Sequence, residues 1–295
     1  MPRGRVVVMA ASKSLSVMEH LEELRAGLLR SLVYVTVGTS VSWAFRNELM
    51  RWLEYPAREG ARRAGLADFS FHIFEPAGGI MMMIQVAVLG GVVLAFAGIA
   101  YEVWKFVRPA LTPGEQRYVY LVLPAAVLLF AAGIWFCYIV TPRAFGFLIV
   151  FNTQLGVEPQ FILGSYLRFF TRLLLVFGLA FETPLVMWFL ARIGLVSSAA
   201  MRRSWRWAVV VIMVIAAMVT PTPDPFNMLL LAGPMMGLYF LSLGLILLVE
   251  MPRRRDKRKA IDIGAHLETP EEPAETEADP ESDARADDND TGSEN

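Results

Sequence analysis

With 295 residues, of which 55% are hydrophobic and 19% charged, and a mean hydropathy of +0.47, the chain is too apolar for an ordinary soluble domain. Its formal net charge of −1 conceals segregation, because the charged residues gather at the chain ends and in short segments between apolar runs. One cysteine excludes an intramolecular disulfide, and the three histidines all lie outside the apolar runs, so we expect no metal site and no cofactor.

The N-terminal part of the chain predicts a helix at a membrane surface. After a basic extension at residues 1–15, Ser16-Val-Met-Glu19 has the capping-box pattern that starts a helix. Apolar residues then recur on one face at helical spacing, while charged residues lie largely on the other faces. We expect an amphipathic helix over Ser16–Arg30 that continues into the first membrane span. Its charges are either solvated groups on an interfacial anchor or part of a binding surface, and the pattern leaves both open.

Six apolar segments follow, and together they predict an all-α, polytopic membrane protein with six transmembrane helices. The fifth segment is the shortest, at about 15 residues or ~22 Å, because three prolines in Thr220-Pro-Thr-Pro-Asp-Pro225 end it. The predicted spans are Gly27–Phe45, Gly79–Tyr101, Tyr118–Val140, Phe169–Ala191, Trp205–Val219 and Asn227–Val249.

The distribution of basic residues predicts the orientation. Lys and Arg flank the first span on its N-terminal side and follow the second, fourth and sixth spans. An even number of spans puts these four segments on one side, which the positive-inside rule assigns to the cytoplasm. In the loop Arg46–Glu75, the residues Arg51, Arg58, Arg62 and Arg63 oppose this assignment, although acidic residues accompany them. We therefore expect a multi-pass protein of the cytoplasmic (inner) membrane with both termini in the cytoplasm.

The predicted domains are the basic extension at 1–15, a six-helix domain at 16–250 and a basic then acidic tail at 251–295. From about Ile261 onward the tail consists mainly of Glu, Asp, Pro and Ala, with almost no large apolar residues. Such a segment cannot bury enough surface to fold, so we expect it to be a disordered, solubilising tail.

Glu182, in Phe-Gly-Leu-Ala-Phe-Glu-Thr-Pro (Phe177–Pro184), is an acid deep inside the fourth span. The next charge downstream, Arg192, is about 10 residues or ~15 Å away, which puts Glu182 near the middle of a ~30 Å hydrocarbon core. A carboxylate there costs about 2.5–3.5 kcal/mol on insertion scales, so it is expected to face a partner, a cavity or a pathway. A protonated or locally paired structural Glu is the alternative.

A second cluster of charged and aromatic residues follows the second span, at Tyr101–Pro109 and Ala110–Arg117. Aromatic and basic residues are expected at a membrane edge, and Pro109 and Pro113 predict a turn. Glu115 lies on the same predicted side of the membrane as Glu23, so acids from two surface segments could converge on a cationic ligand. A simple solvated turn remains the other interpretation.

These residues carry a resemblance to a known family. His-Leu-Glu-Glu-Leu-Arg (20–25), the Val103–Arg117 run, Phe177–Pro184 and Val-Thr-Pro-Thr-Pro-Asp-Pro (219–225) occur in this order and spacing. Together they resemble TatC, the six-helix receptor subunit of the twin-arginine protein translocase. The resemblance covers about Leu15 to Glu250 and leaves out the basic extension and the acidic tail.

The resemblance implies recognition of signal peptides with an Arg-Arg pair, so that folded proteins are exported. It implies small single-span TatA and TatB type subunits as partners, homo-oligomers within a hetero-oligomeric complex, contact with membrane lipid, and no nucleic-acid partner. The signal-peptide positions that it implies are Glu23, Arg25, Phe106, Pro109 and Glu115. The intramembrane or partner positions that it implies are Glu182, Asp224 and Pro56.

Three positions depart from the family pattern. Many relatives have Gln two or three residues after Phe226, where this chain has Met228, and many have Glu where it has Phe240. The family commonly has Gln where this chain has Glu102. These departures put in doubt polar contacts to partner helices along spans 5 and 6, but not the signal-peptide surface.

Arginine chemistry agrees with this role. A guanidinium binds a carboxylate bidentately, which Lys cannot do. Two arginines at ~1.5–3 kcal/mol each supply about 3–6 kcal/mol, whereas micromolar affinity needs about 8 kcal/mol. The apolar stretch of a signal peptide would therefore have to supply the remainder from a groove within the membrane.

Two other functions were weighed against this one. An intramembrane protease needs a nucleophile with a His, or two acids, within the spans, and no span contains a His or a second mid-span acid beside Glu182. We therefore expect no catalytic residue and no enzyme. A proton-coupled solute transporter is the second alternative, because a lone intramembrane acid suits it.

Overall fold

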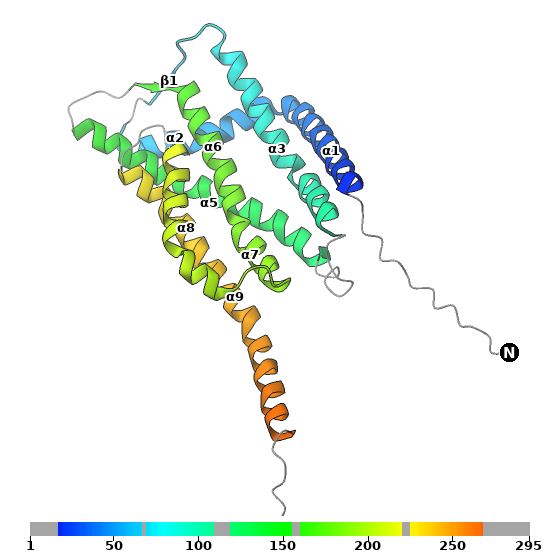
Figure 1. The fold of residues 1–295 in the computed structure, drawn as a ribbon. Coiled ribbons are helices and arrows are strands. Elements are labelled where there is room, and N and C mark those ends of the chain that lie inside the picture. Colours follow the sequence, from blue (N-terminus) through cyan, green and yellow to red (C-terminus); the bar gives the residue numbers. More distant parts are fainter. Residues whose placement is uncertain (1–16, 67–68, 109–118, 155–159, 220–224, 268–295) are drawn as a thin grey trace, which may run out of the picture. The chain divides into compact units, whose positions relative to one another are not determined.

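The computed structural model describes residues 17–66, 69–108, 119–154, 160–219 and 225–267, and most of these are helical (Figure 1). The chain divides into two units, residues 1–251 and 252–295. The helices are α1 Val17–Ala44, α2 Arg46–Arg63, α3 Gly78–Val107, α5 Val119–Gln154, α6 Leu163–Phe181, α7 Thr183–Arg192, α8 Ser198–Val219 and α9 Pro225–Leu267. Two short strands, β1 Phe71–His72 and β2 Phe161–Ile162, pair in parallel.

The described helices include four that are long and apolar enough to cross a membrane: Gly78–Val107, Leu121–Gln154, Leu163–Arg192 and Met228–Leu248. The third combines α6 and α7. A fifth is counted if α1 and α2, which meet at an angle of 85°, form one span. Helix α8, the fifth predicted span, includes three arginines and is outside this set. An all-α, polytopic membrane protein is therefore confirmed, while six spans and the sides of the termini remain predictions.

Helix α1 is continuous over Val17–Ala44, which confirms that the predicted amphipathic segment runs on into the first span. It lies alongside α3 in Figure 1, and two glycines bring the backbones together. A Cβ built on Gly38 would stand 2.6 Å from the carbonyl oxygen of Gly91, and one built on Gly91 would stand 2.6 Å from the Thr39 nitrogen. Real Cβ atoms do not come so close to backbone, so only glycine fits at either position.

Helix α2 packs against α5 and explains the role of Pro56, which is buried in its middle. Proline has no N–H, so the carbonyl of Trp52, four residues earlier, loses its helical donor. The Tyr138 hydroxyl of α5 donates to this carbonyl at 3.2 Å, and its ring stacks on Trp52 with centroids 4.3 Å apart. Pro56 therefore creates an acceptor that attaches α2 to α5.

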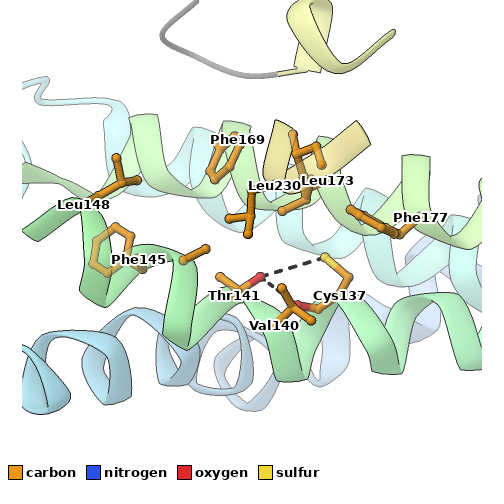
Figure 2. A pocket seen from close by; sticks show the side chains of 11 residues that line it. Cys137, Val140, Thr141, Phe145, Leu148, Phe169, Leu173, Phe177 and Leu230 are labelled. Carbon is orange, nitrogen blue, oxygen red and sulfur yellow. Dashed lines mark hydrogen bonds between the residues drawn. The ribbon is translucent and has the colours of Figure 1, made fainter. Parts of the chain in front are cut away.

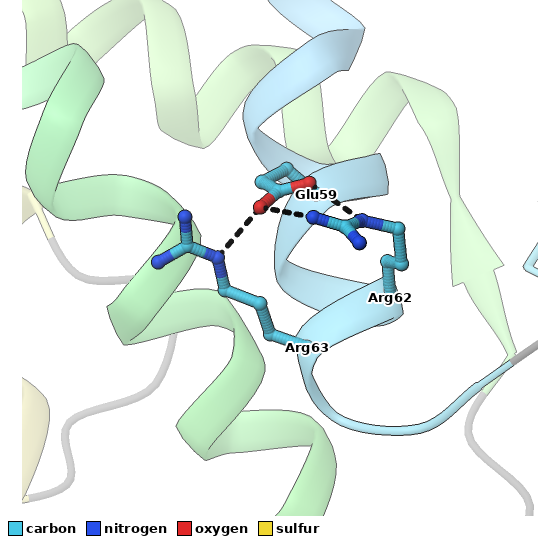
Figure 3. Close-up of polar contacts among 3 residues, drawn as sticks. All are labelled: Glu59, Arg62 and Arg63. Carbon is cyan, nitrogen blue, oxygen red and sulfur yellow. Dashed lines mark hydrogen bonds and ion pairs between the residues drawn. The ribbon is translucent and has the colours of Figure 1, made fainter.

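The outer face of α2 carries the arginines that opposed the predicted orientation. Figure 3 shows that the Glu59 carboxylate accepts hydrogen bonds from Arg62, at 2.9 Å from Nε and Nη2, and from Arg63 Nε at 2.7 Å. These hydrogen bonds lower the pKa of Glu59 to about 2, so the carboxylate is charged at neutral pH. Arg58 pairs in the same way with Glu54, at 2.7 Å. These arginines are therefore partly neutralised within their own helix.

Helix α6 supplies the centre of the core. Leu167, Phe170 and Leu174 are at most 1% exposed. Near its end α6 lies close to α5, because a Cβ on Gly178 would stand 2.6 Å from the Phe130 ring. Many apolar side chains on the outer faces of the helices are exposed, as expected where a membrane protein meets lipid.

Polar contacts join α8 to α9. The Tyr239 hydroxyl donates to the Met201 carbonyl at 2.7 Å. The Glu250 carboxylate accepts hydrogen bonds from the Ser198 backbone nitrogen and hydroxyl, both at 2.6 Å, at the start of α8. Helix α9 continues to Leu267, so the first seven residues of the segment expected to be disordered, 261–267, are helical. Residues 268–295 lie outside the described part of the chain.

Candidate functional site

A pocket of about 180 Å³ lies between the N-terminal half of α1 and the C-terminal end of α3. Glu23 is on its wall, and Phe106, four residues after Glu102, lies on the other helix. The His20 ring stacks on the Phe106 ring at a centroid distance of 4.2 Å. The apolar part of the lining comes mainly from Leu24, Leu28, Ile99 and Val103. Two positions that are 83 residues apart in the sequence (106 − 23) thus share one pocket.

The inner wall of this pocket holds an ion pair between the two helices. The Glu102 carboxylate accepts bonds from Arg30 Nε at 2.8 Å and from Arg30 Nη2 at 2.7 Å, and from the Tyr34 hydroxyl at 3.3 Å. The Glu102 side chain is 5% exposed, so its charge is balanced inside the protein. Sequence reasoning noted Glu102 only as a departure and missed Arg30. The available signal was an unmatched base inside the first apolar run and an unmatched acid directly after the second.

Of the other predicted signal-peptide residues, Arg25 lies within the described part of the chain. Arg25 is exposed and is not part of the pocket wall. Pro109 and Glu115 lie in the segment 109–118, outside the described residues. Asp224 lies in a second such segment, 220–224. Of the five predicted signal-peptide positions, the structure therefore brings Glu23 and Phe106 together in the pocket.

Glu182 occupies the junction between α6 and α7. Pro184 follows in the first turn of α7, and it interrupts the helix because it lacks an N–H. The Glu182 residue is half-buried, and its Oε1 is buried without a hydrogen-bond partner among the described residues. Gly178, one turn earlier on the same face, packs against Phe130 of α5. A polar group therefore stands in apolar surroundings at a break within a membrane span.

Pro56, Met228 and Phe240 lie outside the lining of the pocket between α1 and α3. Pro56 is buried between α2 and α5, as described above. Met228 is half-buried, and Phe240 is 53% exposed on α9. Figure 2 shows a smaller cavity of about 30 Å³ near Cys137, where the Thr141 hydroxyl donates to the Cys137 carbonyl at 2.7 Å. None of the side chains that line this cavity is charged.

The fold and the pocket together define a multi-pass membrane protein with a charged recess where two of its apolar helices end. Comparison with known proteins makes this specific. The family model described as "Sec-independent protein translocase protein (TatC)" matches residues 19–234. The chain therefore belongs to the TatC family, and it is a receptor subunit of the Sec-independent, or twin-arginine, protein translocase.

Individual relatives agree with the family assignment. The TatC protein of Koribacter versatilis is 36% identical over 251 residues, which cover 85% of this chain and 92% of that protein. The one of Campylobacter jejuni is 36% identical over 241 residues, covering 81% and 96%. A crystal structure of the twin arginine translocase receptor TatC matches with a TM-score of 0.71 at 29% identity, covering 78% of this chain and 99% of that one.

These findings confirm the resemblance drawn from the sequence motifs and the predicted location, a multi-pass protein of the cytoplasmic membrane. The chain is a transport component, and as a subunit of a translocase it works in a complex with other subunits.

Proposed function

We propose that the pocket between α1 and α3 receives the Arg-Arg pair of a signal peptide, with Glu23 as a carboxylate ligand. The observation that supports this most directly is the placement of Glu23 and Phe106 on one pocket whose other acid, Glu102, is already paired. Glu23 is therefore the acid on the pocket wall that is available to an incoming cation. Glu115 would add a second carboxylate from the neighbouring segment, and Arg25 and Pro109 would border the site.

The chemistry of this pocket suits a guanidinium. Its planar group can pair bidentately with the Glu23 carboxylate and stack on the Phe106 ring, which an ammonium does less well. Stacking of Arg on an aromatic face contributes about 0.5–2 kcal/mol, according to how far it is desolvated. The apolar stretch of the signal peptide would add affinity by binding to the membrane-embedded surface, since two arginines alone fall short of micromolar binding.

We further propose that the protein acts without catalysis, as a homo-oligomer with small single-span TatA and TatB type subunits. Glu182 would face a polar residue of a partner helix or of the signal peptide, and Asp224 would belong to the partner-facing part. Pro56 is buried within the protein, so it would support that part only through the packing of α2 on α5. This proposal puts both termini in the cytoplasm, since the pocket must meet its ligand before export.

Capture of a labelled signal peptide by the purified full-length protein in lipid nanodiscs tests this proposal. Photo-crosslinking yields are compared for an Arg-Arg peptide and a matched Lys-Lys peptide. We expect the Arg-Arg peptide to bind at least about tenfold more tightly, or about 1.4 kcal/mol, because an ammonium lacks the second parallel hydrogen bond to the carboxylate and the planar stacking of a guanidinium. Equal capture would contradict the proposal. Substrate-stimulated uptake of a small solute by liposomes containing the protein would instead favour a transporter.

Replacement of Glu182 separates hydrogen bonding from charge. Glu182→Gln keeps a polar group at the break between α6 and α7, so export of a reporter is expected to fall only a few-fold. Glu182→Leu removes every polar contact and is expected to abolish most of the export. The measurement is the exported fraction of an Arg-Arg reporter, normalised to the amount of inserted protein. If Gln and Leu cause the same loss, the charge itself is required.

A further inference from the structure

The ion pair between Arg30 and Glu102 is the strongest polar contact between α1 and α3 that the proposed function does not use. Its two N–H donors reach both carboxylate oxygens, at 2.8 and 2.7 Å, which is the bidentate geometry that fixes direction as well as distance. Tyr34, one turn further along α1, adds a third donor at 3.3 Å. The Arg30 side chain is 40% exposed, whereas that of Glu102 is 5% exposed.

We propose that Arg30 and Glu102 are positioning residues, which set the register of α1 on α3 so that Glu23 stands across the pocket from Phe106. This inference rests on the proposed function. An acid on the wall of a cation-binding pocket would ordinarily be taken for a ligand, whereas this inference makes Glu102 a positioning residue.

Geometry prevents Glu102 from binding the incoming guanidinium bidentately. A carboxylate has about four lone-pair directions, and three donors already occupy Glu102. A second cation at this depth would also meet the charge of Arg30 within the same bond network. Glu102 and Arg30 therefore balance each other at the inner wall of the pocket, while Lys105 adds a positive charge to the lining, so the attraction for an arginine comes from Glu23.

Helix periodicity explains how this pair acts on the pocket. Glu23 and Arg30 are seven residues apart, which is about two turns, so they lie on nearly the same face of α1. Glu102 and Phe106 are four residues apart and share a face of α3 in the same way. The bidentate bond thus fixes both helices directly beneath the two groups that would hold the ligand. A shift of α1 by one residue, about 1.5 Å along its axis and 100° around it, would turn Glu23 away.

Four variants of the full-length protein in nanodiscs test this inference through the ratio of Arg-Arg to Lys-Lys peptide affinity. Arg30→Ala and Glu102→Ala each remove one partner, and the ratio is expected to fall at least about tenfold. Arg30→Ala leaves the buried charge of Glu102 unpaired, and Glu102→Ala releases Arg30 from α3. Glu102→Gln still accepts a bond from Arg30, and the exchanged pair Arg30→Glu/Glu102→Arg restores a bidentate contact. Both are expected to stay within about threefold of the wild type.

Glu48→Ala is the matched control, since it breaks an exposed Glu–Arg pair on α2, 3.2 Å long, and should leave the ratio unchanged. If the Ala variants cannot be purified, the peptide selectivity of Glu102→Gln and of the exchanged pair tests the inference. Loss of selectivity in both would show that Glu102 binds the ligand itself and overturn the inference, as would wild-type selectivity in both Ala variants. Failure of the wild type to distinguish the two peptides would instead contradict the proposed function.

Discussion

Glu23→Gln is expected to weaken binding of an Arg-Arg signal peptide by about 10- to 100-fold while the protein stays folded and inserted. The amide keeps the size of the side chain but removes the charge, and a hydrogen bond to a charged group contributes ~1.5–3 kcal/mol. Because Glu23 is half-buried on the pocket wall, its replacement removes the available carboxylate of that wall. The measurement is a binding isotherm of fluorescent peptide in nanodiscs at fixed ionic strength.

Glu22→Gln is the matched control for this variant. Glu22 is the adjacent acid on the same helix, but it is exposed and is not part of the pocket wall. It changes the net charge by the same amount, so a general electrostatic attraction would be weakened equally by both variants. Equal losses for Glu22→Gln and Glu23→Gln would show that the pocket geometry is irrelevant, and an unchanged Glu23→Gln would remove this residue from the site.

Gly91→Leu should separate α1 from α3. A Cβ at this position would stand 2.6 Å from the Thr39 nitrogen and 2.7 Å from the Thr39 Cα, and backbone atoms cannot rotate away as a side chain can. Overpacking of this kind costs about 1–3 kcal/mol or more, which lowers the melting temperature of a domain of this size by about 5 °C or more. Thermal unfolding of the detergent-solubilised protein measures the shift, and export in cells should be lost with it.

Gly79→Leu provides the comparison within the same helix. Nothing lies within 4 Å of a Cβ built at Gly79, so an equally large side chain there should be tolerated. If both Leu variants lower the melting temperature by the same amount, the effect comes from the removal of glycine in general rather than from the α1–α3 contact. A Gly91→Leu protein as stable as the wild type would show that α1 is not held at this point.

The apolar segments and the polar motifs predicted the fold class and the family, because both depend on residues that are close together in the sequence. Runs of apolar residues at Gly79–Tyr101 and Phe169–Ala191 correspond to α3 and to the span made by α6 and α7. The family motifs are also local, and each contains several residues of fixed spacing. Hydropathy is weaker at α8, where three arginines lie in the second and third turns.

Features that depend on contacts between distant segments could not be predicted. The partners Arg30 and Glu102 are 72 residues apart, and neither pattern nor composition indicates that they meet. Arg46–Glu75 is predicted from the sequence as a loop, whereas the structure has helix α2 there. Glu54–Arg58 and Glu59–Arg63 have the spacing of helical ion pairs, which was the signal for this helix. The hydrogen bond from Tyr138 to Trp52 likewise follows from Pro56 only once α5 is known to lie beside α2.

The glycine contact between α1 and α3 has a consequence for biogenesis. Gly38 leaves the ribosome about 50 residues before Gly91, which at about 5–20 residues per second is a delay of ~3–10 s. During that interval the first hydrophobic segment must remain in the bilayer, or beside the insertion machinery, without the neighbour that it needs. Until α3 arrives, Arg30 also lacks its acid, so the nascent chain carries an unneutralised cation at the membrane border. Quality control of this protein should therefore act at the stage when its third helix emerges.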